Sequence, residues 1–178
     1  PIIGADVLLR GDSDEDAPSR LTLLCQNQAG YLNLSVLLSE SYRIGQRDGR
    51  PTVSWEQLQE RADGLIVLAG GVNGAIGQAI SSGNLAEAQA VAERWRRLVG
   101  DRFYIDLVRT GRAGENAYIV QAVELAAKLD IPLVATNDVR FLDAEEFEAH
   151  EARVCISAGE VLDNPQREWP HYPEARAG

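Results

Sequence analysis

The sequence has 178 residues, a length that fits one domain and leaves little room for two. It carries 27 acidic against 17 basic residues, a formal net charge of −10, so we expect no direct DNA binding through the phosphate backbone. Cys25 and Cys155 lack a metal-binding spacing, which argues against a thiolate zinc site and against a disulfide framework. No apolar run approaches the ~18 residues of a membrane helix. These features predict a cytoplasmic protein without membrane contact.

The first part of the chain predicts two strands and two helices. Strands are expected at 2–9 and 20–26, separated by an acidic hairpin tip at 11–19. A helix is expected at 29–42, where apolar residues recur at helical spacing. After a loop that contains Gly45, a short helix begins at Ser54, and Gln57 stands at its capping-box position.

The second part alternates continuous apolar strands with amphipathic helices. The expected strands are 65–69, 103–108 and 131–135, and the expected helices are 84–99, 115–129 and 144–157. On these helices the residues expected to face inward are Leu85, Ala88, Val91, Ala92, Trp95, Val99, Ile119, Val120, Val123, Ala126 and Ala127. Such alternation predicts an α/β fold with a parallel sheet covered by helices, either an open sheet or a barrel. We expect a domain over 1–160 and an extended, proline-containing tail over 161–178.

Polar residues follow the last predicted strand, where ligands gather in parallel α/β folds. Asp138 suits a metal ligand or a general base, but it also suits an ion pair with Arg140 or Arg109. From the residue types alone the ion pair is favoured. His150 lacks the second histidine of a zinc-protease motif, which favours a packed or capping histidine.

Six segments, in order along the chain, carry a family resemblance. They lie at 2–6, 21–24, 27–34, 63–71, 109–112 and 132–141, and the most distinctive are Gly-Tyr-x-Asn-Leu at 30–34 and Ala-Thr-Asn-Asp-Val at 135–139. Together they resemble the polymerase-and-histidinol-phosphatase (PHP) domain of bacterial DNA polymerase III alpha subunits. The resemblance implies a distorted seven-stranded β/α barrel with parallel strands and outer helices. It also implies a piece of that domain, because the opening metal-binding segment is not in the sequence, which contains no methionine even at position 1.

The resemblance identifies the positions where active members of the family hold metal ions. These positions are Asp6, Arg20, Gly70, Gly71, Thr110, Asp138 and Arg140. Only Asp138 keeps the residue of the family pattern, and Asp6 is a shorter substitute for glutamate. Arginine cannot ligate a metal, so we expect an ion-pair network in place of a metal cluster, and no catalytic residue and no resident metal in this chain.

Two functional hypotheses follow from the resemblance. In the first, the chain is a non-catalytic scaffold that docks the proofreading exonuclease subunit and other replicase subunits and supports the remainder of the alpha subunit. That parent would be a DNA-directed DNA polymerase with magnesium, acting in DNA replication. In the second, the complete domain is a zinc- or manganese-dependent phosphoesterase or 3′–5′ exonuclease. Candidate docking surfaces are the helix around Trp95 and the acidic last helix. The basic run Arg94, Arg96 and Arg97 is expected to be a solvated face.

Overall fold

A seven-stranded sheet forms the centre of the structure, in the order β3-β4-β1-β2-β5-β6-β7. The structure is a computed structural model that describes residues 1–13, 16–112 and 114–162. The strands are β1 (Gly4–Leu9), β2 (Ser19–Cys25), β3 (Gln46–Arg47), β4 (Arg50–Val53), β5 (Leu65–Leu68), β6 (Phe103–Val108) and β7 (Leu133–Thr136). Residues 14–15, 113 and 163–178 lie outside the described residues, and with them almost all of the expected tail.

Six helices accompany the described strands. They are α1 (Gln28–Arg43), α2 (Trp55–Arg61), α3 (Ala75–Ser81), α4 (Leu85–Val99), α5 (Glu115–Leu129) and α6 (Phe147–Ala158), and short 3-10 turns occur at 71–73, 100–102 and 144–146. The predicted capping box is present at α2, where Ser54 and Gln57 exchange side-chain and backbone hydrogen bonds. Asn27 and Asn84 are the N-caps of α1 and α4, and the side chain of each accepts a hydrogen bond from a backbone N–H in the first turn. None of the described helices has the length and apolar character to cross a membrane.

The expectation of a parallel sheet is confirmed for only part of the sheet. Strand β2 pairs antiparallel with both neighbours, β1 and β5, whereas β1 with β4 and the series β5, β6, β7 are parallel. Burial patterns report which residues are inside but not which way a strand runs, and the short 10–18 connection suits an antiparallel return. Among the described strands β3 and β7 are the two edges, so the sheet is a mixed α/β sheet whose closure into a barrel is not seen.

Strands β3 and β4 form a small hairpin where the sequence predicted only a loop. Asp48 and Gly49 between them both have positive φ angles, 49° and 73°. An Asp-Gly pair of this kind is a strong short-range hairpin signal. The signal was present in the sequence, but the flanking strands are too short to show periodicity.

The core is one apolar cluster between the sheet and its helices. Strand β2 contributes Leu21 and Leu23, and α4 contributes Ala92 and Trp95, all nearly inaccessible to solvent. The assignment of inward residues fails at four positions, Leu85, Val120, Val123 and Ala127, which are exposed. Helix α5 is apolar on several sides, and the stripe it buries runs through Tyr118, Ala122 and Ala126, whose alanines allow close approach to the sheet.

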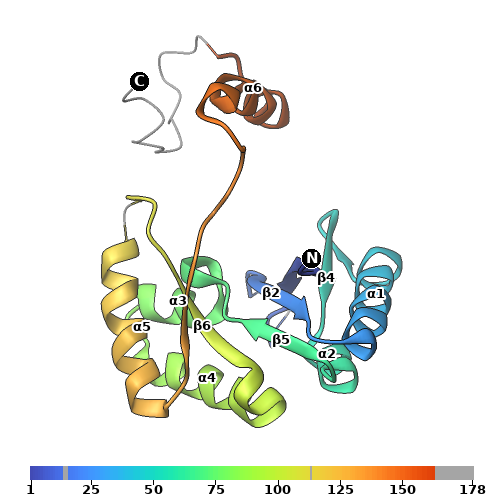
Figure 1. Cartoon of the computed structure of the whole chain (residues 1–178), viewed down its shortest axis with the longest axis vertical. Coiled ribbons are helices and arrows are strands. Elements are labelled where there is room, and N and C mark those ends of the chain that lie inside the picture. Colours follow the sequence, from blue (N-terminus) through green and yellow to red (C-terminus); the bar gives the residue numbers. More distant parts are fainter. Residues whose placement is uncertain (14–15, 113, 163–178) are drawn as a thin grey trace.

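Figure 1 shows how these elements are arranged. Helices α1 and α2 lie beside the part of the sheet that contains β4 and β2, and α3, α4 and α5 lie around β6. Helix α6 stands apart from this body, beyond an extended segment that follows β7.

Candidate functional site

A cavity of 460 Å³ lies at the end of the sheet where β5, β6 and β7 terminate. Because β2 runs antiparallel to β5, its first residues reach this same end, and β1 passes alongside them. The lining residues that carry a charge are Asp6, Arg20, Asp106, Arg112, Glu115 and Asp138. The cavity therefore draws on five strands or strand ends that are far apart in sequence.

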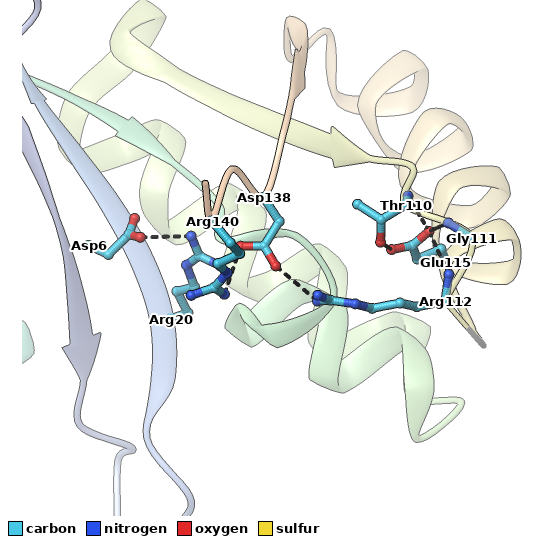
Figure 2. A network of polar contacts seen from close by, with 8 residues as sticks. All are labelled: Asp6, Arg20, Thr110, Gly111, Arg112, Glu115, Asp138 and Arg140. Carbon is cyan, nitrogen blue, oxygen red and sulfur yellow. Dashed lines mark hydrogen bonds and ion pairs between the residues drawn. The ribbon is translucent and has the colours of Figure 1, made fainter. Parts of the chain in front are cut away.

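Asp6 and Arg20 form an ion pair across the β1–β2 ladder. Nη2 of Arg20 lies 2.7 Å from Oδ2 of Asp6 (Figure 2). Oδ1 of Asp6 accepts a hydrogen bond from the hydroxyl of Thr22. Thr22 is the direct partner of Asp6 in the ladder, so the backbone register sets this contact. Both oxygens of the Asp6 carboxylate are thereby engaged by protein groups.

Asp138 is the centre of a second ion cluster (Figure 2), and its side chain is only 8% exposed. Nη2 of Arg140 lies 2.7 Å from Oδ1, Nη1 of Arg112 lies 3.0 Å from Oδ2, and Nη1 of Arg20 lies 3.9 Å from Oδ1. The Arg112 contact is an ion pair rather than an aligned hydrogen bond. Burial acts to raise the pKa of Asp138, but the guanidinium groups of Arg140 and Arg112 outweigh it and hold that pKa below its usual value.

Thr110 and Glu115 form a separate arrangement at the end of β6. The buried Glu115 carboxylate accepts hydrogen bonds from the Thr110 hydroxyl at 2.6 Å and from the backbone N–H groups of Thr110, Gly111 and Arg112 at 2.7, 2.9 and 3.2 Å. Burial acts to raise the pKa of Glu115, and these four hydrogen bonds lower it by more, so the carboxylate stays ionised. Glu115 thus shapes the loop that presents Arg112 to Asp138.

Gly70 and Gly71 form a tight turn under the cavity. Their φ angles are +84° and +60°, and a β-carbon on Gly70 would lie 2.1 Å from the carbonyl oxygen of Arg20. The N–H of Gly71 donates to the buried Asp106 carboxylate at 3.0 Å. Nearby, the buried Tyr118 hydroxyl donates to the backbone carbonyl of Asp106, and burial followed by the Asp106 charge raises the pKa of Tyr118. The turn brings backbone, not a metal-ligating side chain, to this position.

The structure brings together most of the predicted site residues. Asp6, Arg20, Gly70, Gly71 and Asp138 line the cavity, and Arg140 pairs with Asp138. Thr110 does not line the cavity and instead bonds to Glu115.

Three site residues were missed by the sequence reasoning: Asp106, Arg112 and Glu115. Asp106 was detectable, because a carboxylate within the buried strand Phe103–Val108 is unusual. The third cation of the cluster is Arg112 rather than Arg109, which is exposed. Only the path of the loop after β6 decides between these two arginines.

The residues present do not fit the metal cluster that the family resemblance implies. Three guanidinium groups surround Asp138, and a guanidinium neither loses its proton nor ligates a cation. Across residues 1–13, 16–112 and 114–162, no three or more His, Cys, Asp and Glu side chains are grouped so that they could hold a metal ion.

Comparison with known proteins finds one matching family model and several similar proteins. The family model described as "PHP domain" matches residues 1–110. DNA polymerase III subunit alpha of Pseudomonas fluorescens is 47% identical over 168 residues, which are 94% of this chain and 14% of that protein. The subunits of the same name from Vibrio cholerae and Escherichia coli K12 are 42% and 40% identical over 174 residues, 98% of this chain and 15% of each relative. The chain therefore spans only about one seventh of the length of these curated relatives.

Proposed function

Because the chain belongs to the PHP domain family, we propose that it is the PHP region of a replicative DNA polymerase III alpha subunit and acts there as a non-catalytic scaffold. The relatives that support this proposal are named as that subunit, and they match nearly the whole chain. In this proposal polymerisation belongs to the rest of the subunit.

The observation that carries the scaffold proposal is the arginine environment of Asp138. A polynuclear metal site needs carboxylates and neutral imidazoles that offset the charge of the ions. Here the best-preserved carboxylate of the family pattern is already neutralised by Arg140 and Arg112. We therefore propose that the strand end holds no zinc or manganese and contributes rigidity instead.

The metal prediction is tested by isothermal titration calorimetry with Mn²⁺ and Zn²⁺ on the full chain. We expect no stoichiometric uptake in the micromolar range. Uptake that disappears in Asp138→Ala would contradict the proposal.

The second candidate is a metal-dependent phosphoesterase or exonuclease, and its one support is that Asp6, Asp106, Glu115 and Asp138 line one cavity, although among the described residues no three such side chains are grouped closely enough to hold a metal ion. Its test is hydrolysis of a phosphodiester by the complete domain with Mn²⁺. Turnover that is abolished by Asp138→Ala supports the hydrolase, and the absence of turnover supports the scaffold.

The scaffold proposal includes docking of the proofreading exonuclease subunit, and the two surfaces considered for it differ in the structure. Trp95 of α4 is 2% exposed and lies in the core, so it cannot anchor a partner. Helix α6 stands clear of the body and carries the exposed Ile156. These features favour α6 as the docking surface.

The docking proposal is tested by titrating the exonuclease subunit against the full chain. We expect Ile156→Glu on α6 to weaken binding at least about tenfold, because charge replaces apolar contact area. The matched control is Leu85→Glu, which changes an exposed leucine on α4 in the same way and is expected to leave binding unchanged. Equal binding by both variants and the unchanged chain would remove α6 as the docking surface.

A further inference from the structure

Helix α6 is joined to the body by a segment that has little apolar anchorage. Residues 137–141 after β7 belong to no helix or strand, and Figure 1 shows the chain here running from the body to α6. Two of its large apolar side chains, Val139 and Leu142, are 69% and 88% exposed. Hydrophobic burial by these residues therefore does not fix the direction in which the segment leaves the sheet.

The far end of the segment is firmly attached to α6. The ring of Phe141 lies 5.9 Å from that of Phe147 and 5.6 Å from that of His150, which is buried on α6. The N–H of Leu142 donates to the Glu146 carboxylate at 2.9 Å, just before the helix. These contacts couple the orientation of α6 to the position of residues 141 and 142.

The near end of the segment is held by charge. The Asp138 side chain is 8% exposed and contacts Arg140 of the segment itself, Arg112 of the β6–α5 loop and Arg20 of β2. The two outside arginines are themselves fixed: Asp6 pairs with Arg20, and the Glu115 carboxylate accepts from the backbone N–H of Arg112. Asp106 is the other acidic residue lining this cavity, and its carboxylate accepts from Gly71.

We propose that the Asp138 ion cluster is a latch that sets the position of α6 relative to the sheet. When the latch is closed, its ion pairs hold residues 138–140 against β2 and the β6–α5 loop. The aromatic contacts of Phe141 with Phe147 and His150 then fix the position of α6. Open, the segment is free to turn about the end of β7. The arginines are 34 to 42% exposed, so dissolved salt weakens the latch. The inference does not depend on the proposed partner, because it concerns only groups of this chain.

Trypsin provides a direct test, because it cleaves after arginine and Arg140 is part of the latch. While its guanidinium pairs with Asp138, the bond after Arg140 is protected. Asp138→Asn keeps the shape of the side chain and removes its charge. We expect cleavage after Arg140 to become about tenfold faster in this variant, and to accelerate with NaCl in the unchanged chain but not in the variant.

Asp143→Asn is the matched control, since it removes the same charge from the same segment at a residue outside the cluster. Its cleavage rate should equal that of the unchanged chain. Cleavage after Arg102, whose guanidinium donates to the backbone carbonyls of Ala62 and Leu65, reports unfolding of the body. Arg112→Gln removes the ion pair between Asp138 and the β6–α5 loop, so it should also accelerate cleavage after Arg140.

A distance measurement tests the movement of α6 itself. Spin labels attached to p-acetylphenylalanine at position 157 on α6 and position 90 on α4 leave both native cysteines in place. We expect one narrow distance distribution in the unchanged chain and in Asp143→Asn, and a broad one in Asp138→Asn. The proposal is overturned if Asp138→Asn keeps the narrow distribution, or if its cleavage after Arg140 is unchanged or occurs only together with cleavage after Arg102.

Discussion

The guanidinium of Arg140 lies 2.7 Å from the carboxylate of Asp138, a residue only two positions earlier in the segment that follows β7. From the opposite side Arg112 approaches the same carboxylate at 3.0 Å. The negative charge of Asp138 is thus balanced by two guanidinium cations. Both the scaffold proposal and the latch depend on this balance. Removing either the carboxylate or one of the arginines would leave the other charge without its partner.

We expect Glu115→Gln to destabilise the protein by about 1–3 kcal/mol, because an amide cannot replace a carboxylate that accepts four hydrogen bonds. The NH2 of the substituted side chain is itself a hydrogen-bond donor, so it would face N–H and O–H donors where the carboxylate now accepts from them. Urea unfolding at neutral pH measures the loss. Glu124→Gln, on an exposed position of the same helix, is the control and should change stability by less than about 0.5 kcal/mol.

We expect the protein to lose stability as the pH falls below about 4, the usual pKa of carboxyl groups in unfolded chains. Asp138 and Glu115 both have lowered pKa values in the folded protein, held down against burial by arginine charges in one case and by hydrogen bonds in the other. Their contribution is complete above the unfolded pKa and is lost as the pH falls through the folded pKa.

Urea unfolding at a series of pH values from 7 downward measures this slope. The double variant Asp138→Asn, Glu115→Gln should show a shallower decline in the free energy of unfolding than the unchanged chain. Parallel declines in both proteins would mean that other carboxyl groups carry the acid sensitivity.

Gly70→Ala should cost more stability than Gly83→Ala. Both glycines have positive φ angles, +84° and +77°, so both substitutions strain the backbone by about 1 kcal/mol. A β-carbon at Gly70 would in addition lie 2.1 Å from the Arg20 carbonyl oxygen, whereas at Gly83 nothing lies within 4 Å. We expect at least about 1 kcal/mol more for Gly70→Ala by urea unfolding, since β2 must shift. Equal losses in the free energy of unfolding would show that the turn at Gly70 and β2 can move apart at little cost.

Arg94 and Trp55 should show a measurable coupling energy. The guanidinium carbon of Arg94 lies 3.8 Å from the centroid of the Trp55 ring, and Nη1 lies 3.1 Å from Asp12. A double-mutant cycle of Arg94→Gln and Trp55→Leu, read by urea unfolding, is expected to give about 0.5–1 kcal/mol. A coupling near zero would show that the Trp55 ring does not stabilise this arginine.

Much of the local structure was determined by the sequence. The Ser54–Gln57 capping box, the apolar strand 65–69 and the helices around 84–99 and 115–129 were predicted close to their observed bounds, because capping and burial periodicity act over a few residues. The PHP resemblance could also be recognised in the sequence, and the family match over residues 1–110 together with relatives that cover nearly the whole chain confirms it. The degenerate character of the metal positions and the lack of a resident metal stay predictions.

Only the tertiary structure decided which residues meet. The hairpin predicted between 2–9 and 20–26 already gave the direction of β2 relative to β1, but only the pairing of β2 with β5 places Arg20 at the end of the sheet where Asp138 lies. The loop after β6 selects Arg112 over Arg109 through hydrogen bonds to Glu115 that depend on the helix start. Short-range chemistry fixes helices and strands, whereas a contact between residues more than a hundred positions apart depends on how the whole sheet is assembled, and the charge cluster is a contact of that kind.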